Sequence, residues 1–353
     1  MPNRATRLPM SLPRPVIPCS LVLATALAAQ SAAILHVPGG DGPARGAKVV
    51  LIAGDEEYRS EEALPMLARI LAVHHGFDCH VLFHQDPASG VIDPGQATHV
   101  PGLELLEGAE LVVIALRFRR WQDSDMARFA AHVDAGRPIV ALRTSTHAFA
   151  YPRNDSSPFA GWSFDRAGGF GKRVLGETWV AHHGEHGSQG TRGVLAKGHE
   201  QHPILRGVRD VFGPTDVYAI GPLPEDADVL MHGAVVDGLG PDAKPVTGAR
   251  NEPMMPLIWT RERRLAEDRV QRIVCSTIGA ASDFASEDLR RAFVNACYWA
   301  TGREGSLPER ARADTVGGYA PSPFGFGRHR PGITPAMLAI PAIPPTPATT
   351  GSR

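Results

Sequence analysis

The feature that most constrains the fold is a regular alternation of apolar runs with amphipathic helical patterns. The run "KVVLIAG" (Lys48–Gly54) is uniformly apolar and ends in glycine, as a central strand of a parallel sheet does. We expect a helix over Glu61–His75, begun by Ser60 as its cap, and a second helix that starts at Asp123. Further strands are expected at Phe77–Phe83, Ala109–Leu116 and Arg137–Arg143. This β-α-β order predicts an α/β fold with a mostly parallel sheet and right-handed crossovers.

The second half of the chain is less regular. Residues Tyr151–Gly193 form a long stretch rich in histidine, glycine and aromatic residues, which we interpret as an ordered functional insertion. Strand-like segments return at Val229–Val236, Leu257–Thr260 and Val270–Gly279, and a last helix is expected to begin at Ser286 or Asp283 and to end at Gly302.

The N-terminus is typical of a secretory signal peptide. Three arginines precede the short apolar run Val16–Ala29, and small residues follow at Ser31–Ala33. We therefore expect a signal peptide over residues 1–33 and an exported protein, periplasmic or extracellular, with no membrane contact after cleavage. A retained membrane anchor is the alternative. The remaining chain divides into a linker (34–47), one domain (48–302) and a proline-rich, partly disordered extension (303–353).

Charge and cysteine content exclude several classes of function. The chain has 36 Lys+Arg against 37 Asp+Glu, a formal net charge of −1, and its arginines are scattered. This balance favours neither nucleic acid nor an anionic membrane as a partner, whereas a small-molecule partner and a homo-oligomer both remain compatible with it. Cys79, Cys275 and Cys297 lie in apolar surroundings, so we expect inert thiols and no disulfide framework.

Polar residues gather where three of the predicted strands end. They are Asp55–Arg59, Arg117–Arg119 and Arg143–His147. Ligands of parallel sheets bind beyond the carboxyl ends of the strands, so these segments should line one site. Glu56, Arg117 and Arg143 are candidates for holding a polar substrate. The alternative is that the arginines simply form ion pairs with the carboxylates.

The stretch "WVAHHGEHG" (Trp179–Gly187) is the densest cluster of chemically active side chains. His182, His183 and His186 could carry protons near neutral pH or coordinate zinc. The order of residues differs from the H-E-x-x-H metal motif, and two glycines break a helix here. We therefore favour acid/base catalysis by His183 and His186, with His182 in substrate binding. A divalent metal on the three histidines and a surface loop without chemistry are the alternatives.

Other candidate residues lie outside that stretch. His147 follows the fourth strand where related folds carry a nucleophile, but no G-x-S-x-G motif surrounds it, so we expect it to transfer protons. Asp216 and Tyr218 would share one face of a strand, where they could bind a sugar hydroxyl or orient a histidine. Trp179 could stack on a sugar ring.

Several segments, taken in order, resemble the trehalose-utilisation (ThuA-like) family within the class I glutamine amidotransferase-like superfamily. The resemblance covers about residues 48–302 and continues weakly through "GGYAPSPFGFG" (317–327), which is similar to the tail of exported members. The segments that carry it are "KVVLIAGDEEYRSEEALPMLARIL", "PIVALRTSTHAF", "GGFGKRVLGETWVAHHGEHG", "HPILRGV", "PTDVY", "PLIWTRE" and "RIVCSTIGAASDF".

The resemblance implies a flavodoxin-like, doubly wound sheet with helices on both faces and a role in carbohydrate metabolism, on 3-keto-glycosides or related disaccharides. This sequence departs from the family pattern at two places. Arg143 stands where a histidine usually follows the fourth strand, and Gly279-Ala280 replaces a Gly-His pair. The amidotransferase cysteine and its partners have no match, so glutaminase activity is not expected.

Three functional hypotheses follow. The first is an exported enzyme, without a cofactor, that hydrolyses, eliminates or isomerises an oxidised glycoside by histidine acid/base chemistry. The second is a sugar-binding protein without catalytic activity on the same fold. The third is a metal-dependent hydrolase that uses the "HHGEHG" loop.

Overall fold

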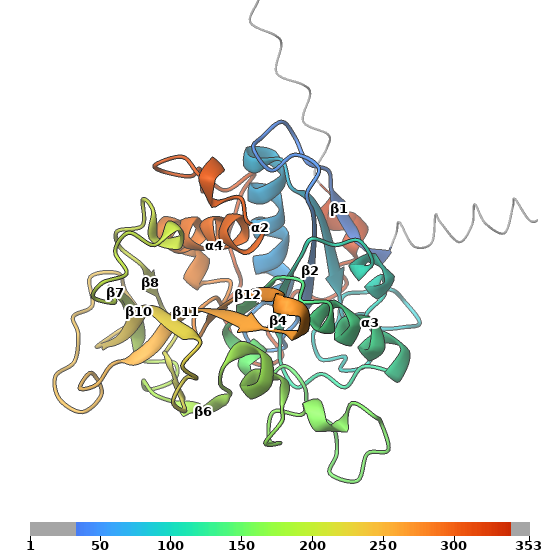
Figure 1. The fold of residues 1–353 in the computed structure, drawn as a ribbon, viewed down its shortest axis with the longest axis horizontal. Coiled ribbons are helices and arrows are strands. Elements are labelled where there is room, and N and C mark those ends of the chain that lie inside the picture. The colour runs from blue at the N-terminus through green and yellow to red at the C-terminus, as the bar shows by residue number, and fades with distance from the viewer. Residues whose placement is uncertain (1–32, 340–353) are drawn as a thin grey trace, which may run out of the picture.

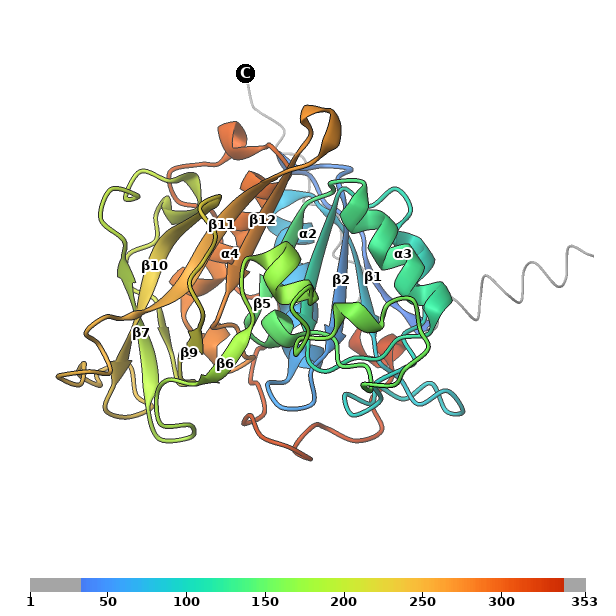
Figure 2. The same ribbon diagram turned by 60° about the horizontal axis from the view of Figure 1, so that its bottom comes forward.

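The computed structural model describes residues 33–339. Nearly all of the expected signal peptide and the last residues of the proline-rich extension lie outside this range. Within it the chain forms a ten-stranded sheet in the order β1-β3-β2-β4-β5-β12-β11-β10-β7-β8 and a two-stranded sheet, β6-β9 (Figure 1; Figure 2). None of the helices in residues 33–339 is long and apolar enough to span a bilayer.

Five strands of the large sheet are parallel. The sequence predicts this direction for four of them, and the fifth is the strand-like segment expected at Val270–Gly279. Neighbouring side chains on these strands point to opposite faces and both faces are buried. Val49 and Leu51 belong to one apolar cluster, whereas Val50 and Ile52 belong to the other. In sheet order these strands are β3 (Asp78–Phe83), β2 (Lys48–Gly54), β4 (Leu111–Leu116), β5 (Ile139–Leu142) and β12 (Val270–Ser276).

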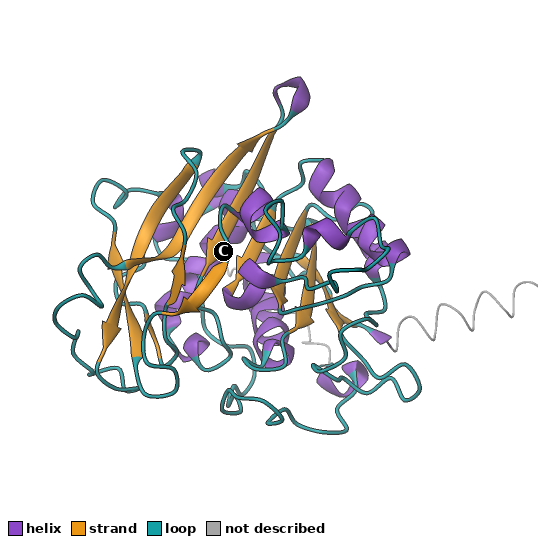
Figure 3. Ribbon diagram, turned by 90° about the horizontal axis from the view of Figure 1, so that it is seen from below, coloured by secondary structure: helices purple, strands orange, loops and turns teal. Residues whose placement is uncertain are grey.

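The rest of the sheet is antiparallel, so the expectation of a mostly parallel sheet is wrong and the sheet is mixed. Long loops surround this end of the sheet (Figure 3). These strands are β11 (Met255–Arg264), β10 (Ala227–Val236), β7 (Gly190–Leu195) and β8 (Phe212–Gly213), with β1 (Leu35–Val37) on the opposite edge. Strand β1 lies in the segment that was expected to be a linker.

Helices cover both faces of the parallel strands (Figure 2). Helices α2 (Ser60–His75) and α4 (Glu287–Ala300) pack on one face, and α3 (Asp123–Asp134) packs on the other. Ser286 caps α4 by accepting the Leu289 N–H at 3.3 Å. Ser60 is not a cap as expected. It is the first residue of α2, and its hydroxyl accepts the N–H of Asp55 at 3.0 Å.

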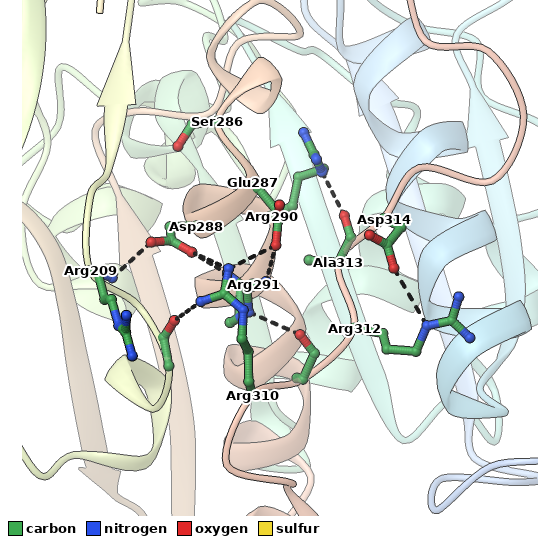
Figure 4. Close-up of polar contacts among 12 residues, drawn as sticks. Arg209, Ser286, Glu287, Asp288, Arg290, Arg291, Arg310, Arg312, Ala313 and Asp314 are labelled. Atoms are coloured by element: carbon green, nitrogen blue, oxygen red, sulfur yellow. Dashed lines mark hydrogen bonds and ion pairs between the residues drawn. The ribbon is translucent and has the colours of Figure 1, made fainter.

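Arginines of α4 fasten the beginning of the C-terminal extension to the domain (Figure 4). The Nε of Arg290 donates to the carbonyl of Ala313 at 2.7 Å, and the Nε of Arg291 donates to that of Ala311 at 2.9 Å. Arg310, from the extension, pairs with Glu287 at 2.9 Å. The extension therefore leaves α4 on a fixed path, which later brings residues 319–330 to the strand ends.

Candidate functional site

The three polar strand ends lie beside one another because β2, β4 and β5 are neighbours in the parallel half of the sheet. Each end contains a non-glycine residue with left-handed backbone: Arg59 (φ 59°), Phe118 (φ 53°) and Arg143 (φ 40°). Such conformations cost free energy and cluster at functional sites, where the surrounding structure holds them. Their coincidence at one edge of the sheet marks the candidate site.

Asp216 is the centre of this site. Its side chain is 0% exposed and its two oxygens contact two histidines and one arginine. Nδ1 of His182 lies 2.8 Å from Oδ2, while Nδ1 of His186 lies 3.1 Å from Oδ1. Burial raises the pKa of Asp216, but the hydrogen bond with His182 and the charge of Arg143 outweigh it and lower the pKa overall. The carboxylate is therefore ionised and orients both imidazoles.

The small β6–β9 sheet brings the histidine loop to Asp216. Strand β6 (Trp179–His182) pairs with β9 (Tyr218–Ile220) so that His182 stands opposite Tyr218. Asp216 precedes β9 by two residues, which places its carboxylate beneath the end of β6. The imidazoles of His182 and His186 then lie with their centroids 4.4 Å apart. The sequence analysis expected Asp216 and Tyr218 on one strand, but only Tyr218 belongs to β9, and Asp216 lies in the loop before it.

Arg143 is enclosed. Its guanidinium lies between the rings of Tyr58 and Tyr218, 3.9 and 4.4 Å from their centroids. It donates to the backbone carbonyls of Asp216 and Thr277 at 2.9 and 3.0 Å. With its side chain 1% exposed, Arg143 holds the site together. The structure does not place it as an open anchor for substrate.

The carboxylates at the end of β2 are paired. Glu56 forms ion pairs with both Arg117 and Arg119. Glu57 lies 3.5 Å from Arg117 and 3.3 Å from Nε2 of His186. Burial raises the pKa of Glu57. The structure therefore contains the ion pairs between arginines and carboxylates that were the alternative to substrate binding. These pairs also position Glu57 against His186.

His147 lies against the same cluster, within a cage of aromatic rings. The centroids of Phe118, Trp179 and Tyr218 are 5.0, 5.2 and 5.8 Å from its imidazole. Burial lowers the pKa of His147 well below its usual value, and the charges of Arg117 and Arg143 act in the same direction. The imidazole is therefore neutral at neutral pH.

His183 does not join the other histidines. Its Nε2 lies 2.7 Å from the carbonyl oxygen of Arg250, in the loop between β10 and β11, and Arg250 in turn donates to the carbonyl of His183. Alternate residues of an extended chain point in opposite directions, so His182 faces the site and its neighbour faces away. Asp216 therefore contacts His182, our candidate for substrate binding, and His186, a candidate for catalysis. His183, the other catalytic candidate of this stretch, lies elsewhere.

A segment of the C-terminal extension completes the site. We call residues 319–330 the C-terminal strap. The N–H of Gly325 donates to the carbonyl of Glu57, and Arg59 donates to the carbonyl of Gly325, both at 2.7 Å. Phe324 lies 5.7 Å from the ring of Tyr58 and 5.6 Å from that of His186. The alternation of glycine and phenylalanine in "FGFG" was the available signal, since Gly325 has a φ of 121° that favours glycine.

Three side chains of this site are also close enough to share a metal ion. Ligand atoms of His182, His186 and Asp216 all lie within 4.8 Å of one another. Two imidazoles and one carboxylate form a donor set that zinc accepts, with further positions open to water. Of the three histidines that we considered as ligands, two are in this group, and the carboxylate takes the place of His183.

The buried His147 predicts a specific pH dependence of stability. The unfolded chain binds a proton at this residue near pH 6.5, whereas the folded chain does not, so stability falls as the pH drops below that value. His147→Gln should reduce this loss by up to about 1.4 kcal/mol per pH unit. Urea unfolding of both proteins from neutral pH to about pH 5 measures the slope.

The matched control is Phe164→Leu, which trims a ring 6.4 Å from His147 and keeps the imidazole. Its slope should equal that of the wild type. An unchanged slope in His147→Gln would mean that the imidazole is protonated in the folded protein.

The strap contacts predict that Phe324 holds this segment on the site. Phe324→Ala removes two ring contacts, each stabilising by about 0.5–1.5 kcal/mol, so amide exchange in residues 319–330 should accelerate. Phe326→Ala is the control, because Phe326 is 60% exposed and lies only over Arg117. Hydrogen–deuterium exchange with peptide resolution gives the comparison. If the amides of residues 319–330 exchange equally slowly in both variants, the backbone hydrogen bonds of Gly325 alone hold the strap on the site.

Known proteins resemble this chain in their three-dimensional structure but not detectably in sequence. The sequence matches no protein-family model and no curated protein. A structure from Bacteroides uniformis ATCC 8492 described as ThuA-like aligns with a TM-score of 0.45 and 14% identity over 75% of this chain and 95% of that chain. Another ThuA-like structure, from Parabacteroides merdae ATCC 43184, gives a TM-score of 0.46 and 16% identity over 73% of this chain and 91% of that one. At these values the similarities assign neither a family nor an activity.

Proposed function

We propose that the protein is an exported enzyme that moves protons on an oxidised glycoside, with the His182–Asp216 pair as its acid/base centre. The observation that carries this proposal is the 2.8 Å contact between Nδ1 of His182 and a carboxylate that is itself 0% exposed. A buried carboxylate on one ring nitrogen fixes the tautomer and leaves the other nitrogen to exchange protons. The His182 side chain is 35% exposed, so this nitrogen is within reach of a ligand.

The proposed chemistry needs no nucleophile. A ketone acidifies the hydrogen on the neighbouring carbon, so an imidazole can remove it as a base. In an elimination the C–H bond breaks, a carbon–carbon double bond forms, and the bond to the glycosidic oxygen breaks as that oxygen takes up a proton. His182 is the proposed base. His186, whose ring centroid lies 4.4 Å from that of His182, is the proposed second proton carrier.

The choice of a carbohydrate rests on two supports. One is the resemblance of the sequence segments to the ThuA-like family. The other is the aromatic surroundings, since Trp179 lies 6.0 Å from His182 and Phe324 lies 5.6 Å from His186. Aromatic faces beside polar groups suit a sugar ring, which has both apolar C–H faces and hydroxyls.

The proposal predicts that His182 is essential and that His183 is not. With a 3-keto-glycoside that the wild type converts, His182→Gln and Asp216→Asn should each lower kcat by about 10²-fold or more. His183→Gln is the matched control in the same loop and should keep wild-type kcat. Turnover is followed by release of the aglycone, with circular dichroism to verify folding.

Wild-type turnover in His182→Gln would refute this proposal. Binding of the sugar by the wild type without any turnover would instead favour the hypothesis of a sugar-binding protein.

A metal-dependent hydrolase is the second candidate, favoured by the His182–His186–Asp216 group. In this case zinc would activate water and polarise the substrate. This hypothesis predicts that the purified protein holds one equivalent of metal, which His186→Ala loses and His183→Ala keeps. It also predicts that a chelator abolishes activity and that added zinc restores it. Elemental analysis after dialysis tests it, and full activity in metal-free protein would exclude it.

A further inference from the structure

A second group of potential ligands lies on β1 and β3, where β1 forms one lateral edge of the large sheet. The antiparallel register places His36 directly across from His80, and Asp78 precedes His80 by two residues. Side chains two apart on a strand share a face, and so do directly opposed residues of paired strands. The backbone pairing alone therefore brings two imidazoles and one carboxylate to one face of the sheet edge.

The side chains converge on one point. Nε2 of His36 lies 2.7 Å from Oδ1 of Asp78, and Nε2 of His80 lies 3.1 Å from Oδ2. Ligand atoms of the three residues lie within 4.8 Å of one another. Two ligands of a tetrahedral zinc ion, each about 2.0–2.1 Å from the metal, are roughly 3.4 Å apart. The observed separations of 2.7 and 3.1 Å are hydrogen-bond distances, and they would lengthen to this value around an ion.

The movement that a bound ion requires is small. The two imidazoles are stacked in parallel, with centroids 4.3 Å apart and an interplanar angle of 5°. Coordination of one ion needs them to tilt toward each other. The side chain of His36 is 46% exposed, so it has room to turn when its contact with Asp78 opens, whereas that of His80, at 13%, is held by its surroundings.

We propose that His36, Asp78 and His80 form a binding site for a divalent transition-metal ion of the zinc class, separate from the candidate functional site. Two imidazoles and a carboxylate provide three ligands, and the exposure of His36 leaves the remaining position open to water. The ion links the short edge strand β1 to the body of the sheet. Because the unfolded chain does not bring these residues together, binding stabilises the fold.

The experiment titrates zinc chloride into the full chain, free of affinity-tag histidines, by calorimetry. All proteins carry His182→Ala, so that the His182–His186–Asp216 group does not contribute. We compare this background with added His36→Ala, with the isosteric Asp78→Asn, and with His232→Ala as the control, whose histidine is in neither group. Thermal unfolding with and without zinc is measured for each.

The background and the His232→Ala control should bind one equivalent of zinc and melt at a higher temperature in its presence. His36→Ala and Asp78→Asn should each weaken binding by at least about tenfold, which is 1.4 kcal/mol, and remove the thermal shift. Equal zinc affinity in all four proteins, or no binding in the background, would overturn the proposal. Because His36 is exposed, misfolding of its variant is not expected, and circular dichroism verifies this.

Discussion

The buried ion pair of Arg143 and Asp216 is the interaction on which the candidate site depends. Arg143 directly follows β5 and Asp216 precedes β9, so the pair joins the parallel half of the large sheet to the small β6–β9 sheet. Removal of one partner from a buried pair leaves an uncompensated charge, at a cost of about 3–5 kcal/mol. Two tyrosine rings enclose the guanidinium of Arg143, and two histidines are hydrogen-bonded to the carboxylate of Asp216. The carboxylate of Asp216 therefore both orients the two histidines and links the two sheets.

The division of the large sheet explains where each part of the site comes from. The parallel half ends its strands at one edge and supplies the buried, fixed groups, such as Arg143 and Glu57. The small β6–β9 sheet and the loop after β6 supply the more exposed groups, such as His182. This arrangement is common in α/β proteins, in which a rigid scaffold carries variable loops at the carboxyl ends of the strands.

Much of this could be predicted from the sequence, because local patterns report local structure. Apolar runs gave the five parallel strands, and the polar residues after them marked the edge where the site lies. The antiparallel half was not predicted, since short apolar segments do not reveal the direction of their partners. The choice between His182 and His183 was also beyond sequence analysis. It depends on which face of β6 meets Asp216, and that is set by the register with β9.

The strap gives the site an unusual span along the chain. Arg59 and Gly325 are 266 positions apart, yet they are hydrogen-bonded at its rim. A chain made from its N-terminus has every strand of the sheet before it has the residues that close over His186. A polypeptide that is still being synthesised, or that has been cut before residue 319, therefore contains the histidines and their carboxylate but lacks one wall of the site. The site is therefore complete only in a chain that contains residues 319–330.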